Sequence, residues 1–404
     1  MLLSFAVENF KGIRTRQELD LNSNLGNEFE DTIMTDGDIG FNLCSCLVGP
    51  NGSGKTHILS AISKFVNSIK TIEDINTAHS PFLLDQDSAS LPTKYEALLY
   101  NSKNATMYNY LFSVLNGEIV EEKLEIKENK KGSRKKLIFE RNESKITFGK
   151  GYATQGNLLK SMITSKGLII YYAQGLDIEH INFINTWANL VYLFNPRRAN
   201  IFGSQIIEEF EKRINNTSED ENSEESFNKI LSHLSKALIS FGLPITKICF
   251  EKNESGKFTY KIKHKVLNGE EKSLSLEEAK DFFSDGTFNT LNMTLFILLG
   301  CNFGSLVLLD EYDDSLHHNL SVEILKLIRS LNKNNNSQAI ITSHDILILD
   351  NGFRRDSIFL IEKNDDLSTQ IKRLSDFSLR KDTKISLKYL NNEFGSLPKI
   401  LTEI

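Results

Sequence analysis

The chain has 404 residues, 40% hydrophobic and 25% charged, which is enough to bury a sizeable core and to form two or three structural units. Its 53 acidic and 47 basic residues give a formal net charge of −6, and this mildly acidic balance does not indicate nucleic-acid binding, although a local basic groove is compatible with it. No segment approaches the roughly 18 uninterrupted apolar residues of a membrane span. The apolar N-terminal segment is too short for a signal peptide, and charged residues follow it too closely. We therefore expect a cytoplasmic protein with no membrane association.

The four cysteines do not indicate a zinc site. Cys44 and Cys46 stand two residues apart in an apolar run, so in a strand their side chains would lie on the same face. No CxxC pair is present, and no histidine stands nearby at zinc-ligand spacing. We therefore expect Cys44, Cys46, Cys249 and Cys301 to be reduced thiols that are mostly buried.

The start of the chain predicts strands that lead into a helix. Residues 2–10 and 17–21 have the pattern of strands, and a polar loop separates them from a short apolar strand at residues 41–48. A helix is expected from Lys55 to about Ile69. Its apolar residues recur at helical spacing: Ile58, Leu59, Ile62, Phe65 and Val66.

From residue 93 to about 148 the sequence alternates between apolar and polar residues and is interrupted by turn residues, which predicts antiparallel hairpins. The basic run KKGSRKK at residues 130–136 is expected at the tip of one hairpin. A solvated turn is one interpretation of this run, and a contact with a phosphate backbone is the alternative.

The pattern of the remaining sequence is mainly helical at first and then alternates between helix and strand. Residues 156–242 read as mostly helical, with a polar, acidic segment at residues 215–226 that we expect to be a flexible surface loop. Strands are expected at residues 245–251 and 257–265. From residue 274 to 374, helix and strand patterns alternate, which is typical of an α/β fold.

A glycine-rich loop follows the apolar strand at residues 41–48 and opens the first helix. The eight residues 49–56 match the pattern G-x-x-x-x-G-K-[ST], in which backbone N–H groups and the N-terminus of the helix bind phosphate oxygens. Lys55 is placed to bind the β- and γ-phosphates, and the Thr56 hydroxyl to bind Mg²⁺. The predicted nucleotide-binding residues are Gly49, Asn51, Gly52, Ser53, Gly54, Lys55 and Thr56.

Two carboxylates follow a second apolar strand at residues 306–309. Because ligands of α/β proteins bind at the carboxyl ends of parallel strands, we expect these side chains beside the phosphate-binding loop. Asp310 would hold Mg²⁺, directly or through water, and Glu311 would polarise the attacking water as general base. A surface acidic pair after a core strand is the alternative.

A third apolar strand, at residues 338–342, is followed by Ser343, His344 and Asp345. A lone histidine is usually structural. At the tip of a strand that follows a phosphate-binding loop and an acidic strand, however, His344 can reach the γ-phosphate, and we predict a catalytic role for it.

The order of these motifs resembles that of ABC-type ATPases, and the opening LSFAVENFKGI resembles the first strand of the RecF, SMC and OLD branch. Ser284, Asp285, Gly286 and Thr287 stand where that family carries its signature motif, usually SGGQ, and differ from it at the second and last positions. Residues 314–317 (DSLH) occupy the D-loop position. This variant resembles the small AAA family ATPases of bacterial phage-defence and abortive-infection operons.

The resemblance implies an α/β fold, namely an ABC-type P-loop NTPase head with an antiparallel β subdomain and an inserted helical subdomain. Residues 1–150 would form the N-terminal half of the head, with the P-loop and the β subdomain. Residues 151–244 would form the inserted helical subdomain with the acidic loop. Residues 245–404 would form the C-terminal half, with the signature, the Walker B strand and the switch histidine.

The resemblance also implies that two copies pair head to tail and enclose two ATP molecules with Mg²⁺. Each nucleotide would then lie between the P-loop of one copy and Ser284 with Gly286 of the other, at the start of a helix at residues 287–299. An ordinary helix N-cap is the alternative for this motif, and both roles are compatible. No segment clearly matches the Q-loop of this family, and Gln86 is a candidate for the Q-loop residue.

These features predict an ATPase that acts as a sensor or regulator of a separately encoded effector protein in antiphage defence. The alternatives are a RecF-like DNA-binding repair ATPase and a nucleotide switch with negligible turnover. The insertion between the P-loop and the signature has no long coiled coil, and the segment after His344 is too short for the nuclease domain of OLD proteins. No N-K-x-D motif for guanine recognition occurs, so ATP is favoured over GTP. Arg197, Arg198, Arg354 and Arg355 are candidate contacts for nucleic acid or a partner, or simply solvated.

Overall fold

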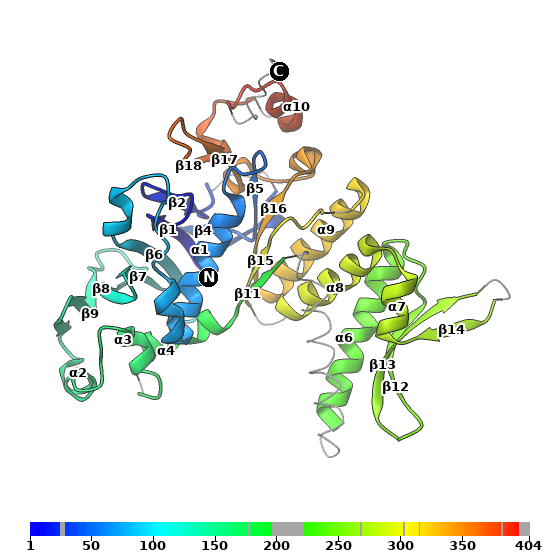
Figure 1. The fold of residues 1–404 in the computed structure, drawn as a ribbon, viewed down its shortest axis with the longest axis horizontal. Coiled ribbons are helices and arrows are strands. Elements are labelled where there is room, and N and C mark those ends of the chain that lie inside the picture. The colour runs from blue at the N-terminus through cyan, green and yellow to red at the C-terminus, as the bar shows by residue number, and fades with distance from the viewer. Residues whose placement is uncertain are drawn as a thin grey trace.

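Two β-sheets with helices packed between and beside them form the main body of the protein (Figure 1). The computed structural model describes residues 1–24, 29–176, 178–195, 221–266, 269–301, 304–314, 316–380 and 383–395, without the side chains of residues 31 and 221–227. None of the helices in these ranges has the length and the apolar composition needed to span a membrane.

A seven-stranded antiparallel sheet forms from the N-terminal segment and from the alternating residues after the first helix. Its strands in spatial order are β10 (Lys145–Phe148), β9 (Lys136–Asn142), β8 (Glu118–Glu128), β7 (Thr106–Leu115), β6 (Thr93–Asn101), β1 (Leu2–Glu8) and β2 (Gln17–Asp20). The alternation gives the sheet one buried face, to which Tyr95, Tyr110 and Phe112 contribute. The predicted strands and hairpins are confirmed, and the basic run occupies the turn between β8 and β9.

A six-stranded, mainly parallel sheet carries the motifs. Its strands in spatial order are β11 (Val191–Phe194), β15 (Leu306–Leu309), β16 (Gln338–Ser343), β5 (Cys44–Val48), β17 (Ile358–Lys363) and β18 (Thr369–Arg373), of which only β18 is antiparallel to its neighbour. Strands β5, β15 and β16 are buried along their whole length, as parallel strands covered on both faces should be. Because parallel strands end at the same edge, the segments after β5, β11, β15 and β16 meet there.

The expected strand at residues 41–48 is divided in the structure. Its first residues end β4 (Ile39–Asn42), which forms a hairpin with β3 (Ile33–Asp36), and the rest is β5. All four cysteines are free, as predicted, and Cys44, Cys46 and Cys301 are buried. Cys44 and Cys46 lie in the same core cluster, so they share a face of β5.

The parallel sheet has a different helix layer on each face. Helices α1 (Lys55–Lys70), α3 (Ile169–Tyr172) and α4 (Glu179–Asn189) fill the space between the two sheets and share one core with both. Helices α8 (Asp285–Gly300) and α9 (His318–Asn335) cover the opposite face of the parallel sheet. The remaining helices include α2 (Ala153–Lys160), next to β10, and α10 (Ile385–Leu390), near the C-terminal end of the described chain.

A smaller unit packs beside α8 and has a core of its own. It consists of α6 (Glu221–Ser240), a three-stranded sheet of β12 (Lys247–Lys252), β13 (Phe258–Lys265) and β14 (Glu271–Leu274), and α7 (Leu276–Phe282). Figure 1 shows it projecting to the right of the parallel sheet. Side chains such as Leu234 and Ile262 are fully buried in it.

The units seen in the structure differ from the three segments expected from the sequence, which divide the chain at residues 151 and 245. Helices α2 to α4 belong with the head, because they pack on α1 and on the antiparallel sheet, and the inserted unit is α+β rather than helical. The three short strands need α6 to cover their apolar face, which is why they group with the helix before them.

The acidic segment at residues 215–226 falls partly on α6. Residues 215–220 lie outside the described residues, but residues 221–226 are helical, so the prediction of a flexible loop is wrong for them.

A buried carboxylate joins the antiparallel sheet to α3. Glu122 on β8 is fully buried and accepts hydrogen bonds from the Tyr110 hydroxyl (3.0 Å) and from the backbone N–H groups of Ile169 (2.7 Å) and Ile170 (3.3 Å). Burial raises the pKa of Glu122 to about 7, although these bonds and the nearby Arg141 guanidinium act in the opposite direction.

We expect this carboxyl group to make the fold less stable as the pH rises. Its pKa in the folded protein lies above the value of 4.5 for an ordinary glutamate, so its stabilising contribution is fully present below pH 4.5 and is lost as the pH rises through about 7. The total loss is about 3 kcal/mol. Chemical denaturation of the wild type and of Glu122→Gln across this range should show the difference in unfolding free energy shrinking with pH. Glu121→Gln, on the opposite face of β8, should show no such trend.

Candidate functional site

The glycine-rich loop joins the end of β5 to α1, and its glycines are required by geometry. Gly52 and Gly54 have φ of 77° and 113°, which side-chain-bearing residues rarely adopt. A Cβ atom on Gly49 would lie 2.1 Å from the Ile361 carbonyl oxygen, and one on Gly54 would lie 2.2 Å from the Thr369 Oγ1. The loop is therefore packed closely against β17 and β18.

Two side chains of this loop fit a bound phosphate chain. The Lys55 Nζ donates to the carbonyl oxygens of Gly49 (2.6 Å) and Pro50 (3.1 Å), and burial lowers the pKa of Lys55 while the carboxylates of Glu311, Asp310 and Asp313 act in the opposite direction. The Ser53 hydroxyl is buried and has no hydrogen-bond partner within the described structure. A phosphate oxygen in the loop would supply an acceptor for both groups.

The pair expected to bind Mg²⁺ is brought together at the start of α1. The Thr56 hydroxyl donates to the Asp310 Oδ1 (3.2 Å), although 254 positions separate the two residues. The same carboxylate accepts from the Thr342 hydroxyl (2.9 Å) and from the Asn195 side-chain amide (3.0 Å). Hydroxyl and carboxylate oxygens are the ligands that Mg²⁺ prefers, and it usually takes only one or two from the protein beside substrate phosphates and water. The residues present therefore fit the ion.

Glu311 and His344 face each other beside the loop. The His344 Nε2 lies 3.4 Å from the Glu311 Oε1. Glu311 has a φ of 49°, and its backbone N–H donates to the Thr342 hydroxyl (2.7 Å), which fixes the turn after β15 on the end of β16. A left-handed backbone at a glutamate is uncommon and is found disproportionately at functional sites.

These residues surround one cavity of about 680 Å³. The side chains that line it come from the P-loop, from the segment after β15 and from the segment after β16: Asn51, Gly52, Ser53, Gly54, Lys55, Thr56, His57, Glu311, Asp313, Asp314 and His344. Three segments that are distant in the sequence therefore converge on one space, as the ends of neighbouring parallel strands should.

The signature residues do not line this cavity. Ser284 is the N-cap of α8, where its hydroxyl accepts from the Thr287 N–H (3.3 Å), and it is exposed. Gly286 lies in the first turn of α8, on the opposite face of the parallel sheet from α1. Both interpretations of the motif stay open, since the cap is present and the side chain is accessible.

Sequence reasoning missed Asn195, which follows β11 and donates to Asp310. The sequence feature that could have indicated the strand before Asn195 is a short apolar run, VYLF, inside a region that reads as helical. Asn195 also lines a second cavity of about 470 Å³ with Thr56, Asp310 and Lys11. Gln86, the candidate for the Q-loop residue, precedes a 3₁₀ helix (Asp87–Ser90) and does not line either cavity.

The arginine candidates have other roles where the structure describes them. Arg354 is buried and forms an ion pair with Asp356 (3.0 Å), so it is not a surface contact. The Arg355 guanidinium donates to the carbonyl oxygens of Leu379 and Arg380. Arg197 and Arg198 lie outside the described residues.

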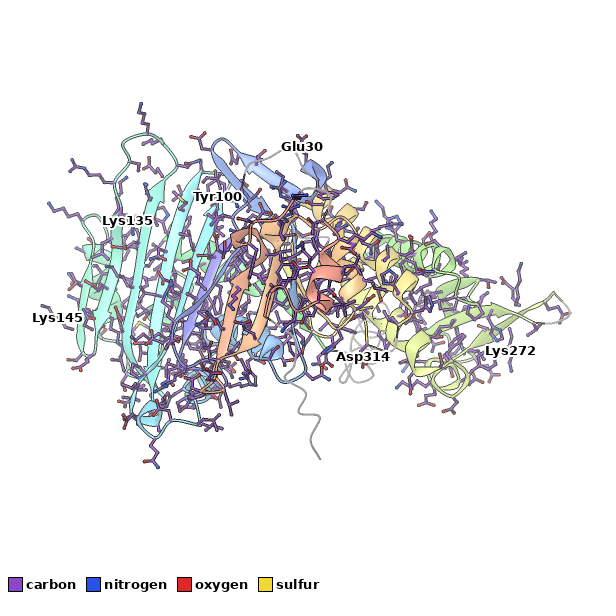
Figure 2. All side chains as sticks on the ribbon, turned by 90° about the horizontal axis from the view of Figure 1, so that it is seen from above. Glu30, Tyr100, Lys135, Lys145, Lys272 and Asp314 are labelled. Carbon is purple, nitrogen blue, oxygen red and sulfur yellow. The ribbon has the colours of Figure 1, made fainter. Side chains whose placement is uncertain are left out.

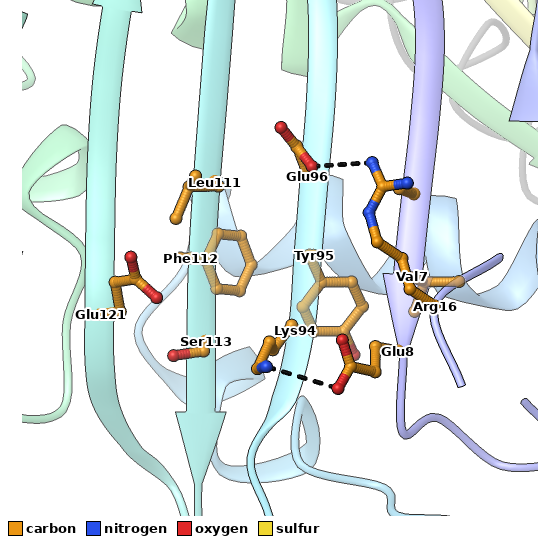
Figure 3. A pocket seen from close by; sticks show the side chains of 11 residues that line it. Val7, Glu8, Arg16, Lys94, Tyr95, Glu96, Leu111, Phe112, Ser113 and Glu121 are labelled. Atoms are coloured by element: carbon orange, nitrogen blue, oxygen red, sulfur yellow. Dashed lines mark hydrogen bonds and ion pairs between the residues drawn. The ribbon is translucent and has the colours of Figure 1, made fainter. Parts of the chain in front are cut away.

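A further depression of about 120 Å³ lies on the outer face of the antiparallel sheet, away from the P-loop. Figure 3 shows two ion pairs across it, Lys94 with Glu8 (3.3 Å) and Arg16 with Glu96 (2.9 Å). Paired charges on an open sheet face are a usual solvated surface, and we assign no chemistry to it.

The same fold occurs in the heads of SMC proteins. An SMC head solved in complex with the C-winged helix domain of ScpA matches with a TM-score of 0.53 and 13% sequence identity, over 94% of this chain and 98% of that chain. An SMC head domain from Thermotoga maritima matches with 14% identity over 92% and 98% (TM-score 0.41). A head with an extended coiled coil, bound to the C-terminal domain of ScpA from Pyrococcus furiosus, matches with 13% identity over 97% and 99% (TM-score 0.46). At 13% identity, the likeness to the first structure concerns the fold alone.

No curated protein matches the chain. A protein-family model described as "AAA domain, putative AbiEii toxin, Type IV TA system" matches residues 44–350, from the start of β5 to beyond β16. The matched range contains the P-loop, Asp310, Glu311 and His344. The chain is therefore a P-loop ATPase of the ABC/SMC-like type and belongs to this AbiEii-type AAA family.

Proposed function

We propose that the protein binds ATP with Mg²⁺, hydrolyses it as a head-to-tail dimer, and thereby regulates a separately encoded effector in antiphage defence. The observation that carries the ATPase part is the convergence of Lys55, Thr56, Glu311 and His344 on one cavity, with Asp310 bonded to Thr56 beside it.

Each residue has a role that follows from its position. The P-loop N–H groups and Lys55 bind the phosphate chain, and the buried Ser53 hydroxyl adds a donor. Thr56 and Asp310 would hold Mg²⁺, which would neutralise negative charge on the phosphate chain. Glu311 accepts a proton from the attacking water, and the His344 imidazole orients Glu311 and approaches the γ-phosphate.

The dimer explains why Ser284 and Gly286 lie away from the P-loop of their own chain. If a second copy supplies them, each site needs residues from two chains. We expect Lys55→Ala and Ser284→Tyr to be inactive alone. Mixed together, they should recover up to about a quarter of wild-type activity, because half of the dimers would be mixed and each would hold one intact site of two. Steady-state ATPase assays on the mixtures measure this recovery.

Two results of the mixing experiment would contradict the dimer. Full activity of Ser284→Tyr would mean that the signature is dispensable and acts only as a helix cap. Absence of any recovery, with mixed dimers shown to form by differently tagged subunits, would mean that the sites are not shared.

The regulatory part rests on a complete candidate ATP site and on the family description, which names a toxin of type IV toxin–antitoxin systems. The test is purification of tagged Glu311→Gln from its host with ATP and Mg²⁺, followed by mass spectrometry. A stoichiometric partner that is absent with Lys55→Ala would support the proposal, and robust intrinsic nuclease activity that survives Lys55→Ala would contradict it.

A RecF-like DNA-binding role is the second candidate, and the basic turn between β8 and β9 favours it. Lys130, Lys135 and Lys136 are 70%, 66% and 63% exposed, although Glu128 pairs with the first and last of them and Glu125 lies 4.0 Å from Lys135. Figure 2 shows Lys135 and Lys145 at one end of the molecule, with Asp314 of the nucleotide site well away from them. ATP-dependent duplex binding that weakens steeply with salt, without a co-purifying protein, would favour this candidate.

A further inference from the structure

Asp313 binds three consecutive residues of the loop after β16. Its Oδ2 accepts hydrogen bonds from the Ser343 hydroxyl (2.8 Å), the His344 backbone N–H (3.0 Å) and the Asp345 backbone N–H (2.7 Å). Asp313 stands only two residues after Glu311, in the turn that follows β15. One carboxylate therefore fastens the segment that carries His344 to the segment that carries Glu311.

These bonds are suited to fixing the loop. Hydrogen bonds to an ionised carboxylate are shorter and stronger than neutral ones. Ser343 is almost fully buried, so its hydroxyl has little water to replace Asp313. These bonds fix the backbone of residues 343–345. From this backbone the His344 imidazole extends toward Glu311, with its Nε2 3.4 Å from the Glu311 Oε1.

A second contact holds the same loop from the other side. The His318 Nδ1 lies 2.5 Å from the Asp345 Oδ2, and His318 is the first residue of α9. The other carboxylate oxygen of Asp345 accepts from the Leu347 N–H (3.0 Å) and begins the 3₁₀ helix that follows (Ile346–Asp350). The loop is thus tied to α9, directly after the D-loop segment.

We propose that Asp313 is a positioning residue of the ATPase site, which sets the His344 imidazole against Glu311 and acts on hydrolysis only through His344. This inference rests on the proposed ATPase function. Within the described residues, the hydrogen bonds of the Asp313 side chain go to the loop after β16, and its charge acts on Lys55 without a hydrogen bond, so its loss should lower turnover more than the affinity for nucleotide.

Kinetics test the proposal through a double-mutant cycle. We expect Asp313→Ala to lower kcat by about 10- to 100-fold, because a small misplacement of a catalytic group has effects of this size. The KM for ATP should change less than about threefold. Asp313→Asn keeps one acceptor oxygen where Oδ2 lies, so it should recover most of the lost activity. Asp313→Ala combined with His344→Ala should be no slower than His344→Ala alone. Ser343→Ala, which removes one of the three donors, should show a smaller loss of the same kind.

A second measurement needs no turnover. The chain has eight histidines, and the imidazole resonance of His344 in a histidine-labelled sample is the one lost in His344→Ala. This resonance should shift or broaden in Asp313→Ala and stay unchanged in Asp87→Asn, which removes an exposed carboxylate elsewhere. Absence of ATPase activity in the wild type would refute the proposed function, and the resonance would still report on positioning.

Three outcomes would overturn the inference. The first is an unchanged His344 resonance in Asp313→Ala. The second is a double variant that is slower than the wild type by the product of the two single effects, since Asp313 would then act independently of His344. The third is a parallel loss of nucleotide binding and thermal stability in Asp313→Ala and Ser343→Ala, which a general structural role would produce.

Discussion

Replacement of Lys55 by alanine should abolish ATP hydrolysis and weaken nucleotide binding by about 10- to 100-fold. A lysine that binds two phosphates contributes charge-assisted hydrogen bonding with a net effect of about 1.5 to 3 kcal/mol in total, which corresponds to this loss of affinity. The same charge stabilises the transition state, and loss of such a group lowers kcat by about a hundredfold or more. Titration with a fluorescent ATP analogue and steady-state phosphate release measure the two effects.

Lys103→Ala is the matched control, because Lys103 is an exposed lysine in the turn between β6 and β7. It should bind and hydrolyse ATP as the wild type does. Among the described residues, the Lys55 side chain bonds only to the loop carbonyl oxygens of Gly49 and Pro50, so the fold should survive its loss. Unchanged binding and turnover in a folded Lys55→Ala protein would remove the P-loop from the proposed mechanism.

Replacement of Glu311 by glutamine should slow hydrolysis by about a hundredfold or more while ATP still binds. The amide has nearly the shape of the carboxylate but cannot accept the proton of the attacking water. The backbone bond from the Glu311 N–H to Thr342 is unaffected by the change. We therefore expect the ATP-bound dimer to accumulate, which size-exclusion chromatography with ATP and Mg²⁺ would detect.

Glu323→Gln provides a control on α9, where Glu323 is half exposed and pairs with Lys326. The Glu311 variant also separates an ATPase from a nucleotide switch with negligible turnover, because a switch has little rate to lose. A wild type as slow as Glu311→Gln, with ATP binding intact in both, would favour the switch.

The parts of the site that the sequence predicted follow from local chemistry. A glycine-rich loop between a strand and a helix has few structural solutions, so residues 49–56 could be placed with their helix. Asp310, Glu311 and His344 each end an apolar run, and parallel strands of that kind end at one edge of a sheet. Their proximity was therefore predictable without knowing the order of the strands.

The parts that escaped prediction depend on contacts between distant segments. Asn195 follows a strand of four residues that reads as part of a helical region, and its partner Asp310 is far along the chain. Asp313 reads as a solvated acid, because nothing local shows that three donors of the loop after β16 point at it. The grouping of β12 to β14 with α6 is likewise a matter of which apolar faces cover each other.

The close packing of the P-loop on β17 and β18 has a consequence for the thermodynamics of binding. Gly49 and Gly54 approach Ile361 and Thr369 so closely that the loop has little room to take another shape. The conformational entropy of the loop is therefore lost when the protein folds and not when a nucleotide arrives. A rigid, preorganised loop retains more of its contact energy as affinity, so calorimetry should find only a small entropic penalty for ordering the protein when ATP binds.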